Sequence, residues 1–341
     1  MRSAKLSVLT MLKLLLFFSY LFPHVFAGED LVFIGPGGGF GSFLKPFVID
    51  FHSDDPVDCD IPHFPLYADD PELNTAQGMV GGVIDGKVTL CGGWFYGPWD
   101  CFNDGSAHNS HGSNYCYSLD PSTKTWKPFP NLLKEGADSD SVILDDGRWW
   151  IIGGFNGNDD YLYDDSTEML TDGSWLPGPT LPMAMAAHCA APLGHKYTLM
   201  AGGYHGIGRN KTWLYDWQNE EFMEVMNLPL PSEHHSCVAL DEENVMMAGG
   251  YSYSPGHGTL NSVSIFNIDT LAWTPVQPLP EPNRDLTLVR DGADVLAIGG
   301  FSNGTIYRYQ TGSGWKKEKK TLAFRIYDFP AFAVTRTMIG C

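Results

Sequence analysis

Histidine and cysteine side chains stand close together at two places in the second half of the sequence. His188 directly precedes Cys189, and His234 and His235 come just before Cys237. Imidazole and thiolate groups suit copper and zinc, so these residues are candidate ligands of a metal centre. The sequence contains no His-Glu-x-x-His motif, no phosphate-binding loop and no Ser-His-Asp order that would indicate another catalytic class.

A repeated position explains two of these histidines without any chemistry. His188 and His235 each lie 14 residues before a Gly-Gly pair. A residue that recurs at one place in a repeat is usually required by the packing of each unit. We therefore expect these histidines to be structural, and we predict no catalytic residues, no metal and no cofactor.

The Gly-Gly pairs recur five times, each after a short apolar strand and before an aromatic residue. The pairs begin at residues 92, 153, 202, 249 and 299, and the aromatic residues are Trp94, Phe155, Tyr204, Tyr251 and Phe301. Further downstream in each repeat stands Trp126, Trp175, Phe222, Trp273 or Trp315. Glycine lets a buried strand end where neighbouring backbones crowd. With one more strand before each pair, every repeat has four antiparallel strands, which is typical of a propeller blade.

This pattern resembles the Kelch repeat over roughly residues 79–315, through the Gly-Gly pair, the aromatic strand and the Trp strand. The resemblance implies a β-propeller and leaves the function open, because one fold can carry many functions. Galactose-oxidase-like enzymes share this architecture and hold copper through Tyr and His side chains. The resemblance therefore keeps one alternative, an extracellular copper enzyme that uses the channel histidines His188, His234 and His235.

The two ends of the chain are expected to complete a sixth blade. Residues 31–34, 46–51 and 58–62 have the pattern of its second, third and fourth strands, and residues 330–335 supply the first. A loosened glycine pair lies near residue 37. Pairing the C-terminal strand with the N-terminal blade removes the exposed edges of an open ring. We therefore predict an all-β protein, one six-bladed propeller domain over residues 28–341.

The first 27 residues have the pattern of a secretory signal peptide. Arg2, Lys5 and Lys13 precede a short apolar run that ends at Val25-Phe26-Ala27. This run is shorter than the ~20 residues that a membrane-spanning helix needs, and no later segment is long enough. We therefore expect a secreted, extracellular protein without membrane insertion.

The composition limits the partners. The chain carries 21 Lys and Arg against 40 Asp and Glu, a formal net charge of −19. Such a charge repels phosphate backbones, which argues against nucleic-acid binding. Acidic doublets are expected to be solvated turns, and the stretch 156–160 lacks the full ligand spacing of a calcium loop.

Seven cysteines follow the signal segment, and an oxidising environment should pair some of them. Cys91 and Cys116 fall on neighbouring strands of one blade, with Cys101 as a competing partner for either. Cys189 and Cys237 fall on the innermost strands of adjacent blades, where either a disulfide or two small buried residues is possible. The odd number leaves at least one cysteine without a partner in a monomer.

Loops between the second and third strands gather on one face of a propeller, and we predict that this face binds an extracellular protein or glycan. Aromatic residues on rigidly held loops make good anchors. The candidate binding residues are Trp94, Trp99, His108, His111, His205, Tyr253 and His257. For Trp94 the repeated position also allows simple packing on its own blade. Asn210 and Asn303 are predicted N-glycosylation sites on the same face.

Overall fold

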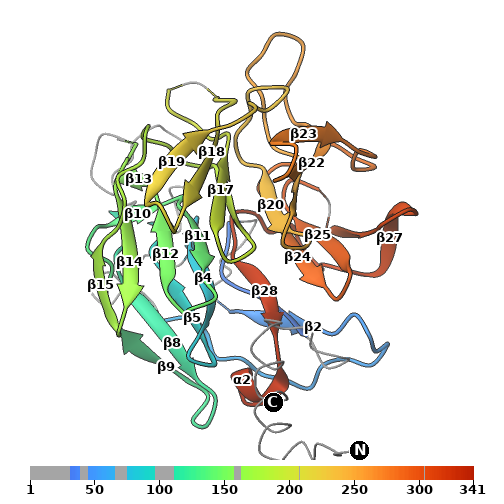
Figure 1. Cartoon of the computed structure of the whole chain (residues 1–341). Helices are drawn as coiled ribbons and strands as arrows, with labels where there is room; N and C mark the ends of the chain where they lie inside the picture. Colours follow the sequence, from blue (N-terminus) through green and yellow to red (C-terminus); the bar gives the residue numbers. More distant parts are fainter. Residues whose placement is uncertain are drawn as a thin grey trace, which may run out of the picture.

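The computed structural model describes residues 31–38, 45–65, 75–96, 111–156, 163–206, 208–302 and 304–341. These residues form a β-propeller of six antiparallel blades around a central axis (Figure 1). Five blades have four strands in sequence order from the axis to the rim. Blade 2 contains β4 (Val80–Ile84), β5 (Lys87–Cys91), β8 (Cys116–Asp120) and β9 (Thr125–Phe129). Blade 3 contains β11 (Asp140–Ile143), β12 (Trp149–Ile152), β14 (Thr167–Thr171) and β15 (Ser174–Pro177).

The next three blades repeat this order. Blade 4 contains β16 (Cys189–Leu193), β17 (Tyr197–Ala201), β18 (Thr212–Asp216) and β19 (Glu221–Glu224). Blade 5 contains β20 (Ser236–Ala239), β21 (Asn244–Ala248), β22 (Val263–Asn267) and β23 (Ala272–Pro275). Blade 6 contains β24 (Leu286–Asp291), β25 (Asp294–Gly299), β26 (Thr305–Gln310) and β27 (Gly314–Thr321). The predicted six-bladed all-β fold is confirmed.

Blade 1 closes the ring with strands from both ends of the chain. Its inner strand is β28 (Ala331–Val334), which pairs with β1 (Leu31–Ile34), and β1 pairs in turn with β2 (Phe47–Ile49). In Figure 1 the red β28 lies beside the blue β2 region. Phe33 and Phe332 are directly opposite each other, and their rings stack with centroids 5.2 Å apart. The predicted closure by the C-terminal strand is therefore confirmed.

The segment 58–62, expected to form the fourth strand of blade 1, has no strand pairing. It nevertheless fills the place of that strand. Trp126 of blade 2 donates its indole N–H to the carbonyl of Pro62 at 3.1 Å, as Trp175 of blade 3 donates to Pro130 of blade 2. A disulfide between Cys59 and Cys341 fixes this segment to the C-terminal region. The bond follows the short helix α2 (Arg336–Ile339), an element that the strand-rich sequence pattern did not indicate.

Packing between blades holds the ring together. The described residues contain six hydrophobic clusters, and each joins side chains of two adjacent blades. Trp149 and Trp150, both fully buried, face opposite neighbours of blade 3 because successive side chains of a strand alternate between its faces. Burying such side chains contributes about 2–3 kcal/mol each. Each blade therefore depends on its neighbours for its core.

Each Gly-Gly pair follows the second strand of its blade and lies close to the backbone that precedes the inner strand of the same blade. Gly250 has a φ of +100°, and a Cβ built on it would lie 2.7 Å from the carbonyl oxygen of Glu233. Only glycine combines this conformation with so close a backbone approach.

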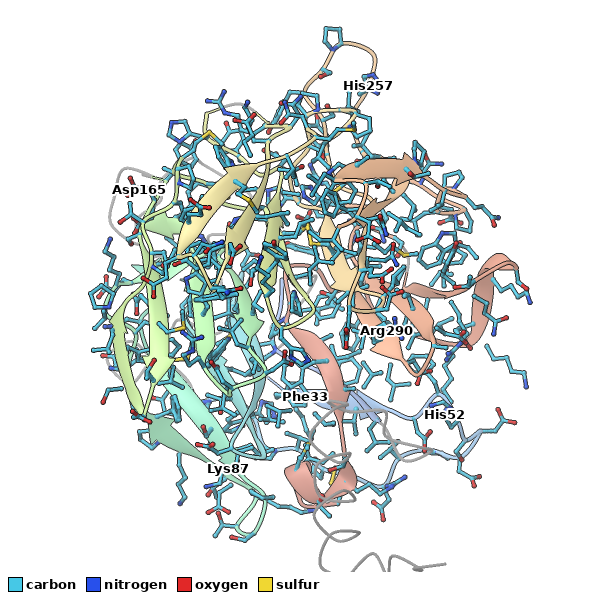
Figure 2. The ribbon with its side chains drawn as sticks, viewed as in Figure 1. Phe33, His52, Lys87, Asp165, His257 and Arg290 are labelled. Carbon is cyan, nitrogen blue, oxygen red and sulfur yellow. A yellow bond between two sulfur atoms is a disulfide. The ribbon has the colours of Figure 1, made fainter. Side chains whose placement is uncertain are left out.

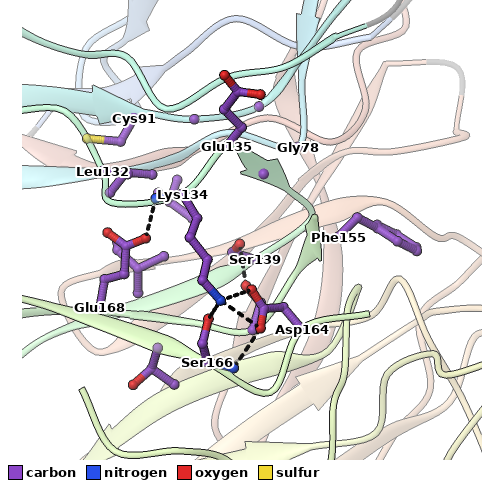
Figure 3. Close-up of a pocket in the computed structure, with 17 residues that line it drawn as sticks. Gly78, Cys91, Leu132, Lys134, Glu135, Ser139, Phe155, Asp164, Ser166 and Glu168 are labelled. Atoms are coloured by element: carbon purple, nitrogen blue, oxygen red, sulfur yellow. Dashed lines mark hydrogen bonds and ion pairs between the residues drawn. The ribbon is translucent and has the colours of Figure 1, made fainter. Parts of the chain in front are cut away.

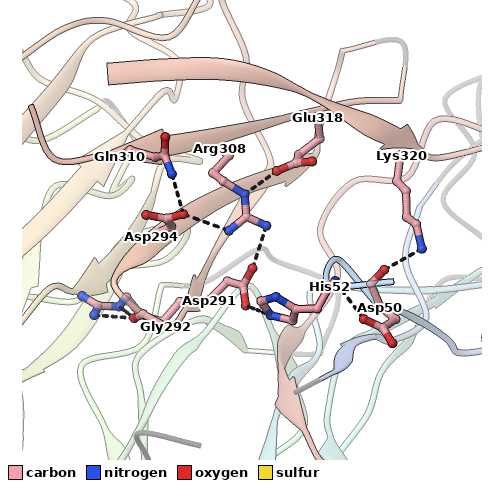
Figure 4. A network of polar contacts seen from close by, with 10 residues as sticks. Asp50, His52, Asp291, Gly292, Asp294, Arg308, Gln310, Glu318 and Lys320 are labelled. Carbon is pink, nitrogen blue, oxygen red and sulfur yellow. Dashed lines mark hydrogen bonds and ion pairs between the residues drawn. The ribbon is translucent and has the colours of Figure 1, made fainter. Parts of the chain in front are cut away.

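A polar network adds to the closure between blades 6 and 1 (Figure 4). The mostly buried guanidinium of Arg308 contacts Asp291 at 2.6 Å, Asp294 at 3.1 Å and Glu318. Asp291 also bonds the imidazole of His52, which follows β2, at 2.8 Å. This network ties blade 6 to the N-terminal part of blade 1. Among the described residues, no helix has the length and apolar character to cross a membrane.

Candidate functional site at the channel mouth

One residue of each blade, placed just before its inner strand, lines the central channel. These six ring residues are Gly78, Asp138, Ala187, His234, Asp285 and Asp328, and all have a φ between +49° and +65°. Each ring N–H donates to the ring carbonyl of the preceding blade, with N to O distances of 2.9–3.3 Å. The bond from Gly78 to Asp328 completes the circle. Asp tolerates this left-handed conformation better than most residues, which accounts in part for three Asp at these positions.

The ring side chains bring charged groups together at the axis. The Nδ1 of His234 lies 2.5 Å from a carboxylate oxygen of Asp285 and 3.9 Å from one of Asp328. Asp138 lies over Gly78, where a Cβ would meet its Oδ1 at 2.2 Å. Trp94 bonds the Asp138 carboxylate. The ring therefore joins one imidazole and three carboxyl groups that are far apart in sequence.

Burial controls the protonation of these groups. Burial raises the pKa of Asp328 to about 8, and the nearby charges of Asp285 and Asp138 add to this effect. Burial also raises the pKa of Asp138 to about 6, against the opposing charge of His234. Burial lowers the pKa of His234, but the charge of Asp285 and hydrogen bonds with Asp285 and Asp328 raise it well above its ordinary value. The contact with Asp285 therefore favours the protonated imidazole of His234, and burial favours the neutral carboxyl of Asp328.

The ring residues line a cavity of about 260 Å³ that inner-strand residues of all six blades enclose. Asp140, two residues after the ring, also lines it and accepts hydrogen bonds from the N–H groups of Ala190 at 2.7 Å and Ser141 at 2.6 Å. Burial raises the pKa of Asp140 to about 7. The cavity is thus lined by four carboxyl groups, and none of its described lining residues is Lys or Arg.

The histidines and cysteines singled out in the sequence separate into two groups. Cys189 and Cys237 form a disulfide between blades 4 and 5, so their sulfurs are not thiolate ligands. His235 donates from Nε2 to the carbonyl of Ala201 at 3.0 Å, between the same two blades. His188 is buried between blades 3 and 4, and neither of its ring nitrogens has a hydrogen-bond partner among the described residues. Of the three histidines, only His234 belongs to the ring.

The remaining cysteines follow a simple arrangement. Cys91 and Cys116 are paired residues of β5 and β8 and are joined by a disulfide. With Cys59 bonded to Cys341, six of the seven cysteines are paired. The seventh, Cys101, lies outside the described residues.

Short strands and aromatic side chains extend the face around the ring. A three-stranded sheet of β3 (Thr75–Gln77), β6 (Trp94–Tyr96) and β7 (His111–Gly112) lies there beside the pair β10 (Gly136–Ala137) and β13 (Phe155–Asn156). These short strand pairs form because the backbone of the residue after each Gly-Gly pair hydrogen-bonds to the backbone of the residue just before the ring position, as Tyr251 does with Glu233.

The predicted binding residues differ in exposure. Trp94 is buried, as its repeated position allowed, whereas Tyr253 is 60% exposed. Tyr253 packs on Tyr251 and Tyr204, with ring centroids 4.8 and 6.0 Å apart, and its hydroxyl bonds the Glu233 carboxylate. His205 packs on Tyr163 at 4.9 Å.

Other predicted residues lie on loops. His257 is exposed near the tip of a projecting loop (Figure 2). The backbone of His111 is in β7, and its side chain is not described. Asn210 lies in the loop before β18 and is partly exposed. Trp99, His108, Asn303 and the signal segment 1–27 lie outside the described residues.

A smaller cavity of about 30 Å³ lies between blades 2 and 3 (Figure 3). There the ammonium of Lys134 contacts Asp164 at 2.9 Å and Ser166 at 2.6 Å. The carboxylate of Glu168 accepts the N–H groups of Leu133 and Lys134. Because these polar groups satisfy one another, this cavity is a structural junction.

Sequence reasoning did not find Asp138, Asp285, Asp328 or Glu233. The sequence does contain a signal for the ring. Five of the six ring residues precede a Gly-Gly pair, and each lies 14 or 15 residues before the first glycine of that pair. The varied residue types at this position concealed it.

The fold and the ring define the class of the protein as a six-bladed β-propeller with an acidic channel mouth. No family model matches the sequence. A solved structure described as "Structure of YjhT" superposes with a TM-score of 0.68 at 13% sequence identity, over 86% of this chain and 95% of that one. This similarity supports the fold alone.

One curated protein shows sequence similarity, the flagellar outer-arm dynein alpha chain of Chlamydomonas reinhardtii. It is 27% identical over 139 residues, which is 37% of this chain and 3% of the dynein chain. The matched segment is thus a very small part of that protein.

Proposed function

We propose that the protein is a secreted, Kelch-type propeller that acts as a non-catalytic scaffold and binds an extracellular protein or glycan through the face around the ring. The carrying observation is Tyr253, a large exposed aromatic side chain held in place by Tyr251, Tyr204 and Glu233. A side chain that is already ordered loses little conformational entropy on binding, so its contacts contribute fully to affinity. Tyrosine is also enriched among residues that dominate binding energy.

Three disulfides support the extracellular part of the proposal, because such bonds persist in oxidising compartments. The loop that carries Asn210 opens on the same face. A sugar there would limit a partner to the rest of that face.

The test is a pull-down from extracellular fluid with the purified protein, together with a glycan array. Tyr253→Ala should remove a bound partner or glycan. The matched control is Leu176→Ala, since Leu176 is 52% exposed on β15 of the outer rim. A partner retained by Tyr253→Ala, or lost equally from both variants, would contradict the proposal. Stoichiometric copper that is lost on replacing His235 would instead favour the copper-enzyme alternative.

A further inference from the structure

Carboxyl groups converge at the ring without Lys or Arg to balance them. Asp138, Asp140, Asp285 and Asp328 all line the one cavity, and His234 is the only ring residue with a basic side chain. The left-handed backbone accounts for Asp at single ring positions, but it does not require that the side chains meet. Carboxyl groups that meet at one channel mouth repel one another when they ionise, and a cation bound among them removes that repulsion.

Three of these side chains have the placement of metal ligands. One donor atom each from His234, Asp285 and Asp328 lies within 4.8 Å of the other two. They come from three consecutive blades, and the ring hydrogen bonds fix their backbones relative to one another. Metal bonds from imidazole and carboxylate to zinc are about 2.0–2.2 Å long, so small side-chain rotations would bring the three donors to a shared ion.

A second observation comes from Glu233, which is only 3% exposed. Its carboxylate accepts the Tyr253 hydroxyl, but its Oε2 has no hydrogen-bond partner among the described residues, and its Oε1 lies 4.0 Å from the Nε2 of His234. Histidines that bind a metal through one ring nitrogen usually donate the other N–H to a carboxylate, which orients the ring. Glu233 stands where such a carboxylate is needed if Nδ1 of His234 faces the ion.

We propose that the channel mouth binds one divalent transition-metal cation, ligated by His234, Asp285 and Asp328, with Glu233 as a positioning residue. The mixed nitrogen and oxygen donors suit zinc, whereas calcium takes oxygen ligands. This site shares His234 with the copper alternative, but its other ligands are carboxylates and neither His188 nor His235 takes part. It does not rest on the proposed binding function.

The experiment is calorimetric titration of ZnCl₂ into the purified, chelator-treated chain, with MnCl₂ and CaCl₂ as parallel probes. We expect one Zn²⁺ per chain, and at least a tenfold weaker affinity for His234→Ala and Asp285→Asn. Glu233→Gln should also weaken binding by about tenfold while the stoichiometry stays at one. Cobalt substitution supplies a second readout, since its visible ligand-field bands should shift in Glu233→Gln and disappear in His234→Ala.

The matched control is His195→Ala, because His195 also pairs with an aspartate, Asp145, but on an exposed turn. It should titrate like the unmodified chain. Circular dichroism will report folding of every variant. If His234→Ala does not fold, Asp328→Asn decides, since it keeps the side-chain shape. Zinc binding weaker than millimolar, or binding that survives both His234→Ala and Asp328→Asn, or equal loss in the control, would overturn the proposal.

Discussion

The disulfide between Cys59 and Cys341 should contribute more to stability than its position near the two ends suggests. It spans 282 residues of sequence, so it closes almost the whole propeller into a covalent loop. In the chain-entropy description, the stabilisation grows with the logarithm of the loop length, and a loop of this size gives about 5 kcal/mol. Since small domains have unfolding free energies of about 5–15 kcal/mol, this one bond is a large fraction of the total.

The variants are Cys59→Ala, Cys341→Ala and the double variant, all combined with Cys101→Ser to prevent disulfide exchange. Urea denaturation followed by tryptophan fluorescence gives each unfolding free energy. Both cysteines are only partly buried, so loss of side-chain packing should be small. Either single change breaks the same bond, so each single variant and the double variant should lose the same amount, about 5 kcal/mol.

Two results would refute this reasoning. Losses that add in the double variant would show that each cysteine acts through its own contacts, because independent sites are additive. A loss below about 1 kcal/mol would show that the unfolded chain already keeps its ends together, so that the bond removes little entropy.

Two further predictions concern the ring and its supports. Gly250→Ala should lower the unfolding free energy by more than the roughly 1–2 kcal/mol that a left-handed alanine costs, because its Cβ would meet the Glu233 carbonyl at 2.7 Å. The control is Gly256→Ala, which has a φ of +82° and open space around it and should cost only that strain. Equal thermal denaturation midpoints for the two variants would contradict this prediction. Asp140 is half-buried and has a pKa of about 7 in the folded chain against an ordinary 3.8. Its contribution to stability is therefore most favourable below pH 3.8 and declines as the pH rises to 7, by up to about 4 kcal/mol. The Asp140→Asn variant should lack this decline. The measurement is the unfolding free energy of the unmodified chain and of the variant at pH 4 and pH 8, and an equal change in both proteins would contradict the prediction.

Much of the fold follows from local patterns in the sequence. The Gly-Gly pairs, with their aromatic and Trp strands, mark five blades because every repeat must solve the same packing problem. Closure by residues 331–334 follows because an unpaired strand at one end fits an incomplete blade at the other. The adjacency of Cys91 and Cys116 follows from the order of strands within a blade.

The site could not be predicted in the same way. His234, Asp285 and Asp328 meet only because three blades place the same backbone position at the axis, and no local pattern reports that convergence. The Cys59–Cys341 bond depends on how an irregular segment runs beside α2. The segment 58–62 has strand-like residues, but their backbone groups found no neighbouring strand to pair with.

The circle of six backbone hydrogen bonds has an electrostatic consequence. All six bonds point the same way around the axis, an arrangement called homodromic, so their dipoles lie along the circle and largely cancel at its centre. The field on the axis therefore comes mainly from the side chains at the ring positions. Because backbone atoms alone hold the circle, those side chains can change without breaking it. The same scaffold could thus carry an acidic, basic or neutral channel mouth through substitutions at six positions.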